Sequence, residues 1–171
     1  VVHLLNNLLD VYRLNEAKET CNDVPFNLNG LLERIASGFS HVVTDKGILF
    51  RQDFKDTDVN LYGDADRIEQ IMDNLLTNAV KFTESGTIAL NACYHEGLLT
   101  LEVKDTGIGM SQETLSRIFR PFERLTSATN VDGVGLGLPI TKGVVRLLGG
   151  EINVTSDIGQ GSTFSVTLPL S

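Results

Sequence analysis

Apolar residues recur at intervals of three and four in four segments of the chain, and this spacing predicts four amphipathic helices. The clearest follows Asp64, with apolar residues at Ile68, Ile71, Met72, Leu75, Leu76 and Ala79. Asp64 is placed to cap that helix, and Asn27 is placed to cap a second one over residues 27–43. The other two helices are expected over residues 1–20 and 139–148.

Shorter runs of apolar and β-branched residues predict six strands. They lie at 47–54, 59–62, 87–94, 98–103, 151–156 and 162–168. The third and fourth form a hairpin around His95–Gly97, and the last two close the chain as another. Helices and hairpins are mixed along the sequence, so the predicted fold class is α+β, built in layers.

Two segments interrupt this pattern. Cys21–Pro25 is polar and contains a proline, so we place a boundary there, with an appendage at 1–22 and a domain at 23–171. Residues 111–132 are rich in Ser, Thr, Asn and Arg, and we expect a mobile loop.

Composition narrows the class of protein. A chain of 171 residues suits one domain with a short appendage. A net charge of −8 argues against a nucleic-acid binder that relies on bulk positive charge. The two cysteines make neither a disulfide framework nor a zinc site, which suits a reducing compartment. The three histidines are scattered without the spacing of metal ligands. No apolar run could span a membrane, and the start at Val1 suggests a piece of a longer protein.

Glycines gather in one part of the chain, since ten of the sixteen lie between Gly107 and Gly161. Glycine lets backbone approach a ligand closely. Asp105–Gly109 (DTGIG) follows a strand, and its carboxylate can accept a hydrogen bond from a ring amine. Gly133–Pro139 (GVGLGLP) precedes a helix and can cradle phosphates with backbone N–H groups. It is neither a dinucleotide fingerprint nor a Walker loop. Taken singly, a turn or a flexible loop also explains each motif.

Polar side chains mark two further motifs. Asn74 and Asn78 share one helix face with Lys81 just beyond, and amide oxygens suit Mg²⁺ while a lysine suits phosphates. Phe119–Arg124 (FRPFER) can clamp a lid and reach a terminal phosphate. Taken by itself, the first motif is explained by polar residues on the flank of a helix, and the second by packing of an exposed loop.

Together and in this order, the motifs resemble the catalytic, ATP-binding domain of sensor histidine kinases. That family belongs to a wider group with DNA gyrase, mismatch-repair and heat-shock chaperone ATPases. The matching strings are DNLLTNAVKFT, DTGIGM, FRPFERL, GVGLGLPITKGVV and the closing GQGSTFSVTLPL. The resemblance covers roughly residues 26–170, and Leu4–Lys18 resembles the end of the second dimerisation helix. It implies a two-layer α/β sandwich, with a mixed sheet packed against helices.

The resemblance also implies residue roles. Asn78, assisted by Asn74, would hold Mg²⁺ on the triphosphate, and Lys81 would contact the phosphates. Asp105 would accept a hydrogen bond from the adenine amino group. Asn78, Lys81 and Arg124 would take part in phosphoryl transfer. The other residues implied to admit the base, line the phosphates or form the lid are Gly107, Gly109, Phe119, Phe122, Gly133, Gly135, Leu136 and Gly137.

The implied activity is transfer of the γ-phosphoryl group of ATP, with Mg²⁺, to a histidine on a dimerisation and phosphotransfer domain. Implied partners are that domain, a response regulator and a second copy in a full-length homodimer. The implied location is cytoplasmic, either as a free protein or as the inner part of a membrane-anchored sensor. The family's acceptor histidine precedes an acidic residue and usually Arg-Thr-Pro, and this string is absent. His3, His41 and His95 are therefore expected to be surface or packing residues.

Two alternatives stay open at this point. A gyrase-like ATPase of the same fold would hydrolyse ATP, and Asp73 beside Asn74 lies where a general base for water could sit. A non-catalytic nucleotide-binding module would keep the binding residues without turnover.

Overall fold

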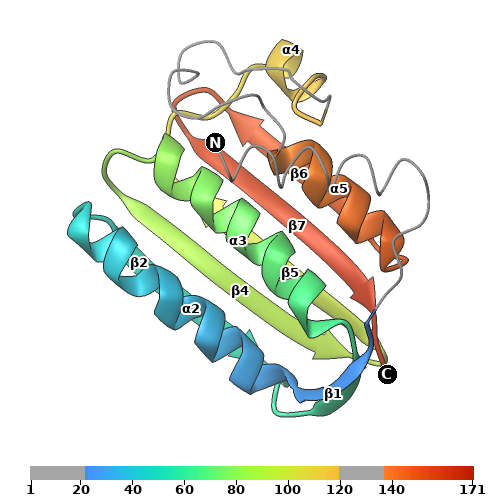
Figure 1. Ribbon diagram of the computed structural model, residues 1–171. Coiled ribbons are helices and arrows are strands. Elements are labelled where there is room, and N and C mark those ends of the chain that lie inside the picture. The colour runs from blue at the N-terminus through green and yellow to red at the C-terminus, as the bar shows by residue number, and fades with distance from the viewer. Residues whose placement is uncertain (1–21, 120–136) are drawn as a thin grey trace, which may run out of the picture.

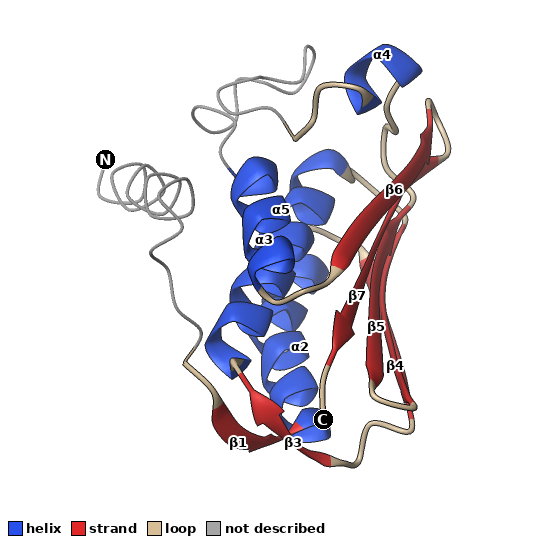
Figure 2. Ribbon diagram, turned by 90° about the vertical axis from the view of Figure 1, so that its right-hand side faces the viewer, coloured by secondary structure: helices blue, strands red, loops and turns tan. Residues whose placement is uncertain are grey.

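A five-stranded sheet with three long helices laid across one face forms the two layers of the fold (Figure 1, Figure 2). The computed structural model describes residues 22–119 and 137–171. Its elements are β1 (Val24–Asn27), α2 (Leu28–Asp45), β2 (Leu49–Lys55), β3 (Asn60–Gly63), α3 (Ala65–Phe82), β4 (Thr87–His95), β5 (Leu98–Asp105), α4 (Gln112–Leu115), α5 (Gly137–Leu147), β6 (Glu151–Asp157) and β7 (Gly161–Pro169).

The main sheet has the strand order β2-β4-β5-β7-β6. Only β2 and β4 run parallel, and the other neighbouring strands are antiparallel. Side chains alternate along the three central strands, so that Leu90, Leu101 and Val166 are buried under the helices. Figure 2 shows α2, α3 and α5 on one side of the sheet, and no described element covers the other side. The predicted α+β class and the two-layer sandwich are confirmed.

Capping and burial explain the two longest helices. The Asn27 side chain accepts a hydrogen bond from the backbone N–H of Gly30, and the Asp64 side chain accepts one from that of Arg67. The apolar positions predicted for α3 are all buried, which places this helix at the centre of the helical layer. Each fully buried Leu, Ile or Met side chain contributes about 1.5–3 kcal/mol.

The structure differs from the sequence prediction at two short elements. Val24–Asn27 forms the strand β1, although its proline favoured a break. β1 pairs with β3, and a pairing on one edge tolerates Pro25 without an N–H. Within the predicted loop 111–132, Gln112–Leu115 forms the single-turn helix α4, with Ser111 as its cap.

Two predictions concern residues at or before the first described residue. The helix at 1–20 lies outside the described residues, and the boundary at residue 22 stays a prediction. Among the helices of the described residues, none has the length and apolar character needed to cross a membrane.

Backbone segments meet closely where β5 ends. Gly109 and Gly161 both have positive φ. A Cβ at Gly109 would fall against the carbonyl oxygen of Asp157, and one at Gly161 against that of Asp105. Two backbone hydrogen bonds hold the same region: Ile108 N donates to the carbonyl of Phe82 at 3.1 Å, and Gly159 N donates to that of Ile108 at 2.8 Å. The loop after β5 is thus fixed between the end of α3 and the β6–β7 turn.

Gly161→Ala is expected to destabilise the fold much more than Gly159→Ala. Both residues have positive φ, which costs about 1–2 kcal/mol for alanine. Only at Gly161 does the added methyl also meet backbone, whereas Gly159 has open space. Urea unfolding of the two variants measures the difference, and equal losses of stability would show that the close approach is unimportant.

Candidate functional site

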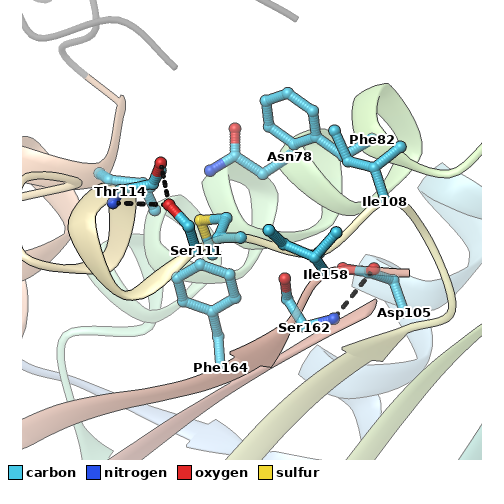
Figure 3. Close-up of a pocket in the computed structure, with 12 residues that line it drawn as sticks. Asn78, Phe82, Asp105, Ile108, Ser111, Thr114, Ile158, Ser162 and Phe164 are labelled. Atoms are coloured by element: carbon cyan, nitrogen blue, oxygen red, sulfur yellow. Dashed lines mark hydrogen bonds between the residues drawn. The ribbon is translucent and has the colours of Figure 1, made fainter. Parts of the chain in front are cut away.

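A cavity of about 230 Å³ opens where β5, β7, the end of α3 and the start of α5 converge (Figure 3). Loops on either side complete it: the segment after β5 and the β6–β7 turn. Its lining residues are Asn78, Phe82, Asp105, Ile108, Gly109, Met110, Ser111, Thr114, Leu138, Ile158, Ser162 and Phe164. The volume is below the ~300–1,000 Å³ of pockets that enclose a whole drug-sized ligand, so it suits a single ring system.

Asp105 provides the buried charge of this cavity. It is the last residue of β5 and only 5% exposed. Its Oδ1 accepts hydrogen bonds from Gly107 N at 2.9 Å and Ser162 N at 3.3 Å. Burial raises the pKa of Asp105, and the two backbone donors partly oppose that rise. Among the described residues no donor bonds to Oδ2, so this oxygen remains an acceptor for a ligand.

Ser162 lies beside Asp105 in the cavity and was not singled out by the sequence (Figure 3). It is the second residue of β7, opposite Asp105 in the antiparallel pairing. Its hydroxyl lies 2.8 Å from the hydroxyl of Ser156 on β6. The only signal in the sequence was the resemblance of the closing hairpin, which carried no residue role.

The walls of the cavity are mainly apolar. Phe82, Met110 and Phe164 are half-buried or buried, while Ile108 is 46% and Ile158 71% exposed at the rim. Exposed isoleucines beside a buried carboxylate can cover the faces of a flat ring whose edge carries an amine. The cavity therefore suits an amino-substituted heterocycle.

The polar residues of α3 do not all reach the cavity. Asn78 lines it, and Figure 3 shows its side chain across the hollow from Ser162. One turn earlier, Asn74 Nδ2 donates to Thr141 Oγ1 at 3.1 Å and to the Gly137 carbonyl at 3.4 Å. Asn74 thus joins α3 to the first turn of α5. Lys81 lies in the last turn of α3 and is not among the lining residues.

The described residues contain no cluster of three or more His, Cys, Asp or Glu side chains that could hold a metal ion. A hard cation at this cavity would have Asn78 as a protein ligand and would need oxygens from water and ligand. Mg²⁺ commonly binds in this way, with few protein ligands and the phosphates of a substrate. The chemistry of the Asn78 side chain therefore fits a single protein ligand of such an ion.

The remaining predicted site residues are divided between the described part and the rest of the chain. Phe119 packs against the core, with Lys142 Nζ 5.1 Å from its ring centroid, and does not line the cavity. A Cβ at Gly107 would fall against the carbonyl group of Phe82, and Gly137 begins α5. The residues outside the described ranges are Phe122, Arg124, Gly133, Gly135 and Leu136.

Asp73, the candidate base of a hydrolysing enzyme, lies outside the cavity lining. Burial and the negative charge of Glu69 raise the pKa of Asp73. This carboxylate sits one residue before Asn74, on a different side of α3 from the lining residue Asn78.

Comparison with known proteins identifies the family. Residues 63–171 match the family described as histidine kinase-, DNA gyrase B-, and HSP90-like ATPase. The chain is 35% identical over 176 residues to the autoinducer 2 sensor kinase/phosphatase LuxQ of Vibrio parahaemolyticus, and 31% identical over 173 residues to the sensor histidine kinase RcsC of Escherichia coli. These matches cover 98% and 99% of this chain, but only 20% and 18% of those relatives.

Solved structures agree with this assignment. Full-length ShkA in complex with AMPPNP superposes with a TM-score of 0.87 at 32% identity, over 99% of this chain and 35% of that one. The catalytic domain of the histidine kinase ThkA gives a TM-score of 0.75 at 27% identity, over 86% of this chain and 97% of that one. The chain therefore belongs to the family of histidine kinase-, DNA gyrase B- and HSP90-like ATPases, and its relatives in that family are sensor histidine kinases.

Proposed function

We propose that this chain binds ATP with Mg²⁺ and delivers the γ-phosphoryl group to a histidine on a separate dimerisation domain. The observation that carries the proposal is the buried Asp105 carboxylate, with Oδ2 open to an apolar cavity of nucleobase size. Membership of the ATPase family and likeness to an AMPPNP complex support the same conclusion.

The base end of the site discriminates by hydrogen bonding. Asp105 Oδ2 accepts a hydrogen bond from the exocyclic amine of adenine, while Gly107 N and Ser162 N hold Oδ1 in place. Ile108 and Ile158 cover the ring at the rim. Gly109 lies in the lining, and its missing side chain lets the loop pass close to Asp157.

The phosphate end begins at Asn78. When bound, Mg²⁺ neutralises charge on the triphosphate. Asn78 would hold the ion, assisted by Asn74 one turn earlier on α3. Lys81 follows in the same helix and supplies positive charge near the phosphates. The amino end of α5 at Gly137 adds backbone N–H groups and a favourable helix dipole. The other residues proposed to line the phosphates or form the lid are Phe119, Phe122, Arg124, Gly133, Gly135 and Leu136.

The phosphoryl acceptor is proposed to lie on another domain. Among the described histidines, His95 precedes an acidic residue, with its Nε2 3.7 Å from Glu96 Oε2. The strand register pairs Ile88 with Asp105 and His95 with Leu98, so His95 lies at the opposite end of β4. At ~3.3 Å per residue, that strand separates His95 from the cavity by roughly 23 Å. The proposed partners are a response regulator and, in a full-length homodimer, a second copy of the kinase. The proposed location is the cytoplasm.

Asp105→Asn is expected to weaken ATP binding by about 1.5–3 kcal/mol, because the amide nitrogen replaces the open Oδ2 acceptor with a donor. Stability at neutral pH should not fall. The pKa of Asp105 is higher in the folded protein than in the unfolded chain, so the ionised carboxylate opposes folding. The stability of the wild-type protein should therefore rise as the pH falls from the folded-state pKa to the unfolded-state pKa, and Asp105→Asn should lack this dependence.

Calorimetric ATP titration and thermal unfolding separate these two effects. Asp53→Asn, which removes the same charge from an exposed position on β2, is the matched control. ATP affinity equal to that of the control would remove Asp105 from the binding site.

Asn78→Ala is expected to abolish the gain in ATP affinity that Mg²⁺ provides, while binding of ATP in EDTA changes little. The reason is that the amide oxygen acts on the metal rather than on the base. Titrations with and without Mg²⁺ measure this, and Thr77→Ala, an exposed neighbour on α3, is the control. Equal weakening in both titrations would make Asn78 a structural residue.

Incubation with γ-labelled ATP tests the transfer itself. Acid-labile label should appear on a separately made dimerisation domain and not on this chain alone, since neither described histidine lines the cavity. Asn78→Ala should prevent that labelling. Label on this chain alone would overturn the proposal, release of labelled phosphate without any labelled protein would favour the gyrase-like ATPase, and binding without turnover would favour a non-catalytic module.

A further inference from the structure

One hydroxyl on β6 connects three parts of the candidate site. Ser156 Oγ lies 2.8 Å from the backbone nitrogen of Met110, 2.9 Å from the carbonyl oxygen of Gly161 and 2.8 Å from Ser162 Oγ. Met110 belongs to the loop after β5, and Gly161 and Ser162 begin β7. Met110 and Ser162 line the cavity, whereas Ser156 does not. Ser156 therefore touches the cavity only through its neighbours.

The directions of these hydrogen bonds follow from the groups involved. The Gly161 carbonyl can only accept, so it takes the single hydroxyl hydrogen of Ser156. The Met110 N–H can only donate, so it occupies one lone pair of Ser156 Oγ. The remaining contact is satisfied only if the Ser162 hydroxyl donates to the other lone pair.

This arrangement decides what Ser162 offers to a ligand. Its hydrogen points to Ser156, so its lone pairs remain for the cavity. Beside it, Oδ2 of Asp105 is a second acceptor without a hydrogen bond from the described residues. Asp105 and Ser162 thus present two acceptors to the cavity, and neither side chain offers it a donor.

We propose that Ser156 is a positioning residue that selects an amino group over a keto group in the bound base, by holding the Ser162 hydroxyl as an acceptor. The inference rests on the proposed nucleotide-binding function and concerns a residue outside the cavity. An exocyclic amine has two N–H donors for two acceptors. A keto oxygen at the same position would face two acceptors, which is unfavourable for both partners.

Removing the Ser156 hydroxyl frees the hydrogen of Ser162. The Ser162 hydroxyl can then turn and donate into the cavity, which weakens an amino base and favours a keto base. ITP is a suitable probe, because it carries an oxo group where ATP carries the amine. The ratio of ATP to ITP affinity therefore reports the orientation of this hydroxyl.

Ser156→Ala is expected to lower the ATP-to-ITP affinity ratio roughly threefold to tenfold, the factor that one neutral hydrogen bond supplies. Ser156→Thr keeps the hydroxyl and should retain the ATP-to-ITP affinity ratio of the wild-type protein. Thr155→Ala, on the opposite face of β6, should not change it. In a Ser162→Ala background, Ser156→Ala should have no further effect, because the two residues act through one hydroxyl.

Amide hydrogen exchange of Met110 in nucleotide-free protein provides an independent measurement. Exchange should accelerate in Ser156→Ala, since the N–H loses its acceptor, and should remain slow in Thr155→Ala. This readout needs no ligand, so it tests the Ser156 network even if the wild-type protein binds neither nucleotide. In that case the proposed function fails, and the selectivity proposal fails with it.

Equal loss of ATP and ITP affinity in Ser156→Ala would overturn the inference and make Ser156 a structural residue only. An unchanged ratio together with faster Met110 exchange would also overturn it, because the network would then exist without controlling selectivity. A lowered ratio that persists in the Ser162→Ala background would show that the effect does not pass through Ser162.

Discussion

The burial of one carboxylate sets the main constraint on this structure. Asp105 is almost inaccessible, and burying a charge is unfavourable unless donors surround it. The backbone supplies those donors at Gly107 and Ser162, so the loop after β5 and the start of β7 must approach the same oxygen. Glycine at position 161 makes this approach sterically possible. The second oxygen stays open because both donors bond to Oδ1.

Several elements connect the rest of the fold to this carboxylate. α3 begins at the Asp64 cap, packs between α2 and α5 on the sheet and ends at Phe82, whose carbonyl holds the loop after β5. Asn74 ties the same helix to the first turn of α5. A substitution in α3 can therefore change the site by moving the loop or α5, without touching a ligand.

The sequence predicted the parts of this structure that depend on local pattern. The caps Asn27 and Asp64, the buried face of α3 and the position of Asp105 at a strand end all follow from short-range spacing. Ser162 could not be placed in the same way, because it meets Asp105 across 57 positions of sequence. Such a contact depends on strand register, which is set by packing of the whole sheet.

Local chemistry also explains how a chain with a net charge of −8 can accommodate an anionic nucleotide. The cavity is largely apolar, and Asp105 is the one carboxylate among its described lining residues. In the proposed complex, this carboxylate faces the amino group of the base rather than the triphosphate. The polar groups of the opposite end, Asn78 and the start of α5, are uncharged or electropositive. Exposed carboxylates elsewhere act through water and salt, whose screening length is about 8 Å at physiological ionic strength. Binding is therefore governed by the few groups within the site, and the overall charge mainly affects how fast an anion approaches.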